Sequence, residues 1–130
     1  MKRGIAFLGM SLVVLALVSG CAGVQTASKL NDQQLTSSDT PIAHLHADNW
    51  GIYLLPIVPL LTGSTANPGW PAIFDDTVNV ESVVDMTTAK SKSLGATKTT
   101  DLESKTSSVW LVPTLFFWYK SVEVSGNASK

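Results

Sequence analysis

Three side chains that could bind a metal stand at alternate positions in one short stretch of this sequence. His44, His46 and Asp48 are separated by single residues, and in a β-strand residues two apart project from the same face. Two imidazoles on one face suit zinc or copper, and Asp75 or Asp76 could supply a further ligand. The alternative is that the histidines lie on the solvent face of an edge strand and bind nothing. Because the ligand set is incomplete, we predict no cofactor.

Motifs typical of enzymes are not found elsewhere in the sequence. There is no Gly-x-Ser-x-Gly elbow, and the single cysteine is Cys21. The run Gly63-Ser64-Thr65 lacks the lysine and the later glycine of a phosphate-binding loop. The adjacent Asp75 and Asp76 would point to opposite sides of an extended chain, so they do not make an acid–base pair. We therefore expect no enzymatic activity.

Cys21 directly follows a stretch with the organisation of a secretory signal. Residues 2–3 are basic, residues 5–18 are apolar and uncharged, and small residues stand at 19 and 20. The run Leu17-Val18-Ser19-Gly20-Cys21 resembles the lipobox of bacterial lipoproteins. The resemblance implies that a diacylglycerol is attached to the Cys21 sulfur, for which a thiolate is the required nucleophile, and that the leader is then removed.

Two other interpretations of this leader remain open. One is an uncleaved transmembrane anchor, although a spanning helix needs about 20 apolar residues and this stretch is shorter. The other is a plain secretory signal that is cut at an unrelated small residue. In lipoproteins of two-membrane bacteria, an aspartate directly after the cysteine is typical of retention in the inner membrane. Ala22 stands there, so the resemblance implies anchoring in the outer membrane, facing the periplasm.

The composition argues against nucleic-acid binding. The chain has 130 residues, with nine Lys and Arg against ten Asp and Glu. Without Lys2 and Arg3, seven basic residues face ten acidic ones, a net charge of −3, and no arginine is left. Nucleic-acid binding uses a basic, arginine-rich face, so we exclude that class of partner. A single cysteine also means that no disulfide forms within the chain.

The remaining pattern predicts a small α/β domain behind a tether. We expect a signal peptide at 1–20, a polar, flexible tether at 21–40 and one domain at 41–130. Alternation predicts strands over 42–47 and 120–125, and threonine-rich sequence a strand over 96–106. A helix is predicted between the N-cap Asn79 and Gly95. The predicted fold is β-α-β-β, with one helix packed on a mainly antiparallel sheet.

The predicted helix has one stripe of residues at helical spacing. The stripe consists of Val80, Val83, Val84, Thr87, Ser91 and Leu94. We expect Val84 to face the sheet and Asp85 to face solvent.

Two apolar runs with a central proline are the remaining candidates for function. They cover 50–61 and 109–119. They are either ordinary core or an exposed patch, containing Trp50, Leu55, Trp110 and Phe117, that meets a partner protein or the membrane interface. Prolines interrupt regular strand pairing, which favours protruding loops.

The domain loosely resembles small bacterial envelope lipoproteins that have no assigned activity. The similarity lies in Ser93-Leu94-Gly95-Ala96, where a helix leads into a strand, and in the closing run 122–128. It implies no catalytic residues. We therefore expect a lipid-anchored outer-membrane lipoprotein with a structural or adaptor role and an envelope protein as partner. The alternative is a periplasmic module that binds a small ligand or a metal through His44 and His46.

Overall fold

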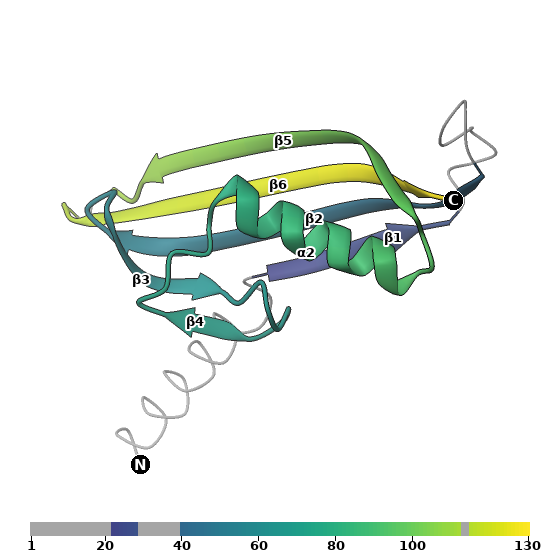
Figure 1. Ribbon diagram of the computed structural model, residues 1–130. Coiled ribbons are helices and arrows are strands. Elements are labelled where there is room, and N and C mark those ends of the chain that lie inside the picture. Colours follow the sequence, from purple (N-terminus) through teal and green to yellow (C-terminus); the bar gives the residue numbers. More distant parts are fainter. Residues whose placement is uncertain (1–21, 29–39, 113–114) are drawn as a thin grey trace, which may run out of the picture.

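The computed structural model describes residues 22–28, 40–112 and 115–130. In chain order the elements are β1 (Ala22–Ala27), β2 (Pro41–Leu54), β3 (Val58–Gly63), β4 (Pro71–Ile73), α2 (Val80–Ser93), β5 (Lys98–Trp110) and β6 (Phe117–Ser129). All the strand pairs are antiparallel. The helix lies across one face of the sheet (Figure 1).

The sheet is organised around β2, whose two edges are used differently. The order is β4-β3-β2-β6-β5, and β1 also pairs with β2. One edge of β2 pairs with β6 along almost its whole length. The other edge is shared: β1 pairs with His44–Asn49 and β3 pairs with Gly51–Leu54. The three long strands β2, β6 and β5 therefore lie side by side, and the β2–β3 and β5–β6 turns lie at the same end of them.

The predicted β-α-β-β fold is wrong, because the described chain contains six strands and one helix and is dominated by its sheet. Three strands were not predicted. β1 falls in the predicted tether, because its mostly small residues show no alternation and its ladder with β2 comes from backbone groups. β3 and β4 fall in a turn-rich region. Pro59 is accommodated in β3 because it pairs with Tyr53 where the register shifts, and proline is tolerated at such bulges.

The predicted helix is confirmed. The Asn79 side chain caps α2 by accepting a hydrogen bond from the Ser82 amide, and Gly95 has a left-handed φ of 82° just after the C-cap. Val83 and Thr87 are buried against the sheet together with Met86, whereas Val80 and Leu94 are exposed. The buried stripe is therefore centred on Val83, and Val84 is only partly buried.

The two faces of the sheet differ in what covers them. The face under α2 carries the core, which includes Leu45, Ala47 and Tyr53 of β2 and Val122 and Val124 of β6. The opposite face, called here the open face, carries the alternate residues of the same strands. Within the described residues no helix covers the open face.

Candidate functional site

The central parts of the two apolar runs form neighbouring turns at one end of the sheet, and the ends of each run lie in the flanking strands. The Leu55 amide donates a hydrogen bond to the Phe116 carbonyl, with an N···O distance of 2.6 Å. This bond joins the β2–β3 turn to the β5–β6 turn, although the two residues are 61 positions apart in the chain. Figure 1 shows both turns at the same end of the long strands. We call this end the apolar tip.

Large apolar side chains of the tip are exposed to solvent. The members are Leu54, Leu55, Ile57, Val58, Trp110, Val112, Leu115, Phe116 and Phe117. Ile57 is 76% exposed, and Val112 and Leu115 are each 70% exposed. Neither of the two runs contains a charged residue. Contiguous exposed apolar surface of this kind marks sites of contact with proteins or membranes.

The backbone of the β2–β3 turn is strained at an apolar residue. Leu55 has a left-handed φ of 49°, a conformation that costs a bulky residue on the order of 1–3 kcal/mol. The Ile57 amide donates to the Leu55 carbonyl at 2.7 Å, which closes a tight turn around Pro56. Strained residues of this kind cluster at functional sites. The turn therefore holds Leu55 in an exposed position against its conformational preference.

Three of the four predicted patch residues belong to the tip. Leu55, Trp110 and Phe117 are exposed there. Trp50 lies on the open face, partly buried, where its ring packs 5.8 Å from the Tyr119 ring. The predicted patch is thus brought together at one end of the molecule, with Trp50 below it on the open face.

A second group of exposed apolar residues was not singled out from the sequence. Trp70, Ile73 and Phe74 lie in or next to β4, and Trp70 and Phe74 are 71% and 72% exposed. Phe74 also has a left-handed φ, of 58°. The Pro- and Gly-rich sequence before β4 indicated only a turn. The available signal for an exposed side chain was Trp70, which stands between the turn-forming residues Gly69 and Pro71.

The histidines and Asp48 share the open face, as their alternation predicts. The ring Nδ1 of His44 lies 2.8 Å from Asn127 Oδ1, and Asn127 in turn donates to Asp101 Oδ2 at 3.0 Å. This chain of contacts links β2, β6 and β5 and fixes the His44 ring. Within the described residues, no three His, Cys, Asp or Glu side chains are placed to hold one metal ion.

The pKa of Asp48, on this face, is shifted by its surroundings. Burial raises its pKa above the usual 3.8, and the Glu123 carboxylate raises it further, whereas His46 lowers it. Asp48 and Glu123 are paired across β2 and β6, and like charges in that position repel. The surroundings of Asp48 therefore disfavour its charged form, which is the form that would bind a metal ion.

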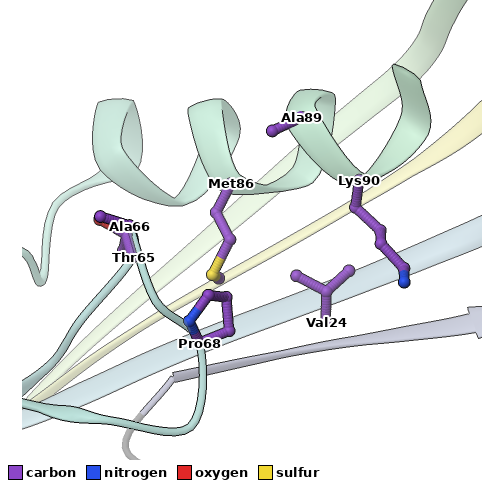
Figure 2. A pocket seen from close by; sticks show the side chains of 7 residues that line it. All are labelled: Val24, Thr65, Ala66, Pro68, Met86, Ala89 and Lys90. Atoms are coloured by element: carbon purple, nitrogen blue, oxygen red, sulfur yellow. The ribbon is translucent and has the colours of Figure 1, made fainter. Parts of the chain in front are cut away.

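A small hollow lies on the helix face between α2, β1 and the 64–70 loop. Its volume is about 240 Å³, and Val24, Pro68 and Met86 are among its lining residues. Figure 2 shows the Met86 side chain extending from α2 toward Pro68, with Lys90 at the margin. Ligand pockets usually hold about 300–1,000 Å³ and combine apolar walls with several convergent polar groups. This hollow is smaller and has one charged group.

Cys21 itself lies outside the described residues, but its neighbour is fixed. Ala22 is the first residue of β1 and is 2% exposed. It pairs with Asn49 in the middle of β2, and its carbonyl accepts a hydrogen bond of 3.0 Å from the Gly69 amide. The segment directly after Cys21 is therefore part of the sheet, and Trp70 lies one residue from this contact.

None of the helices in the described part of the chain has the length and apolar character needed to cross a membrane. Comparison of the chain with models of protein families, with curated proteins and with solved structures finds no match.

Proposed function

We propose that this chain is a lipid-anchored lipoprotein of the bacterial outer membrane, facing the periplasm, with a non-catalytic structural or adaptor role. The lipid is attached to Cys21, and the apolar tip is the surface through which the domain makes contact. The observation that carries the proposal is the junction of two charge-free turns by the bond between Leu55 and Phe116. That junction gathers exposed apolar side chains from distant parts of the sequence.

A non-catalytic role is supported by the character of this surface. The exposed side chains of the tip, within the described residues, are aromatic and aliphatic and include no charged or nucleophilic group. Apolar surfaces of this kind provide binding energy through a few aromatic and aliphatic anchors, and they supply no acid, base or nucleophile for a reaction. The tip therefore suits attachment.

The anchor is tested by following labelled palmitate into the chain in growing bacteria. The wild-type chain should become labelled, and Cys21→Ser should remain unlabelled and keep its leader, because a hydroxyl does not replace the thiolate. Equal labelling of the two chains would remove the anchor from the proposal.

The contact surface is tested by charge substitutions on one strand. Phe117→Glu should leave a cooperative thermal transition, because Phe117 is already 37% exposed. Val122→Glu on the same strand should abolish that transition, because Val122 is buried and a charge there would lack a partner. If Phe117→Glu also loses the transition, Phe117 belongs to the core.

A further inference from the structure

We propose that the apolar tip inserts into the interface of the same membrane that holds the Cys21 lipid, so that the protein is attached at two points. This inference rests on the lipid at Cys21 proposed above. It names a lipid bilayer as the partner of the tip.

The direction of β1 carries the first step. β1 is antiparallel to β2, and β2 runs toward the tip, so the start of β1 points toward the tip. Cys21 is bonded to Ala22, and consecutive Cα atoms are about 3.8 Å apart. Ala22 is therefore the end of β1 that lies nearer the tip, as Figure 1 also shows.

The short distance between the two points carries the second step. Ala22 pairs with Asn49, and β2 ends five residues later at Leu54. At about 3.4 Å per residue this separates Ala22, the residue bonded to Cys21, from the tip by roughly 17 Å along the strands. Because Ala22 is held in the sheet, no tether lies between the lipid and the domain. Cys21 and the tip reach the membrane together when the strands are inclined to it.

The side chains between the two points carry the third step. Trp70 lies beside the Ala22–Gly69 contact, and the Phe74 amide is 3.5 Å from the Leu60 carbonyl, closer to the tip. Both rings are exposed. Tryptophan is favoured at the membrane interface, and exposed aromatic residues thus continue from the anchor toward the tip.

The charge distribution distinguishes this mode of binding from electrostatic adsorption. The two tip runs are uncharged, and the chain after the leader has a net charge of −3. Anionic headgroups would therefore not attract the domain. Insertion should rest on apolar burial alone, and the linked lipid raises the effective concentration of the tip at the surface.

The test places a thiol-reactive fluorophore on one of two exposed leucines in the full chain. Leu115→Cys lies in the tip, and Leu102→Cys lies on β5, away from the tip, and is 46% exposed. Each labelled chain is reconstituted into phosphatidylcholine vesicles that contain nitroxide-labelled lipid. We expect strong quenching of the fluorophore at position 115 and little at position 102. The quenching should be unchanged by salt or by added phosphatidylglycerol.

Two controls are added: a charged residue in the tip, and fluorophore labelling of the wild-type chain, whose single cysteine is Cys21. Ile57→Asp should remove most of the quenching at position 115, while palmitate labelling persists. Quenching at 115 that equals that at 102, with Cys21 still acylated, would overturn insertion and leave the anchor intact. If position 115 is protected from aqueous iodide but is not quenched by the labelled lipid, the tip is covered by the leader or by a second copy of the chain. That result would also overturn membrane insertion. Labelling of the wild-type chain would show that Cys21 is free, so both the anchor and this inference would fail.

Discussion

Asn49 and Gly63 exchange two hydrogen bonds where β3 leaves the edge of β2. The Gly63 amide donates to Asn49 Oδ1 at 3.1 Å, and Asn49 Nδ2 donates to the Gly63 carbonyl at 3.2 Å. Asn49 Nδ2 also donates to the Thr77 carbonyl at 2.9 Å. A buried side chain thus takes the place of a backbone partner at the point where β1 and β3 divide one edge of β2.

We predict that Asn49→Ala lowers the free energy of unfolding by about 2–4 kcal/mol, since the Gly63 amide and the Thr77 carbonyl lose their hydrogen bonds to the buried Asn49 side chain. Asn127→Ala is the control, because Asn127 bonds His44 and Asp101 on the less buried open face and should cost less than about 1 kcal/mol. Urea unfolding measures both. Equal losses of unfolding free energy in the two variants would show that the hydrogen bonds of Asn49 stabilise the fold no more than those of Asn127.

The register of α2 gives a second prediction. Val83→Asp would bury an unpaired carboxylate at a residue with 0% exposure, which we expect to cost several kcal/mol. Val84→Asp should cost less because Val84 is only partly buried, and the exposed Asp85→Ala should be nearly silent. Thermal melting ranks the three. A larger loss for Val84→Asp than for Val83→Asp would contradict the register.

The raised pKa of Asp48 predicts a pH-dependent effect. The folded state binds the Asp48 proton more tightly than the unfolded state, so stability falls as pH rises through the window that starts near 3.8. Asp48→Asn should therefore raise the melting temperature at pH 7 and leave it unchanged below pH 3.8, where both states are protonated. Melting curves at pH 3 and pH 7 measure the difference. A gain of equal size at both values would exclude titration of Asp48 as its cause.

Addition of zinc separates the adaptor role from the metal-binding alternative. We expect calorimetric titration of the full chain to show no stoichiometric binding, because the described residues offer no group of three ligands and structural zinc sites use four. Binding of one equivalent that disappears in a double variant, His44→Ala with His46→Ala, would instead support the metal-binding module.

The helix could be predicted because local chemistry determines it, whereas the strand predicted over 42–47 extends to Leu54 as β2. Asn79 and Gly95 mark the ends of α2, and β2 ends at Leu54, two residues before Pro56. The strands β1, β3 and β4 could not be predicted, because their own sequences carry no alternating pattern and each becomes a strand only by pairing with a neighbouring strand. β1 shows this most clearly, since its sequence is that of a linker and its partner lies about 20 residues further along the chain.

The site was predictable in composition and not in arrangement. Two charge-free runs with prolines indicated protruding apolar turns, and Leu55, Trp110 and Phe117 are exposed there. Their assembly into one surface depends on the antiparallel pairing of β2 with β6, which places position 54 opposite position 117. No local feature of the sequence specifies that register.

The way β1 joins the sheet also determines how the domain responds to mechanical load. Its ladder with β2 extends from Ala22↔Asn49 to Ala27↔His44, and the hydrogen bonds of an antiparallel ladder lie across the strands. A pull on Ala22 along the strand axis loads all these bonds in shear at once, whereas a pull across the strand would open them one after another. A force applied to the start of β1 along the strands therefore meets the direction in which this ladder resists most.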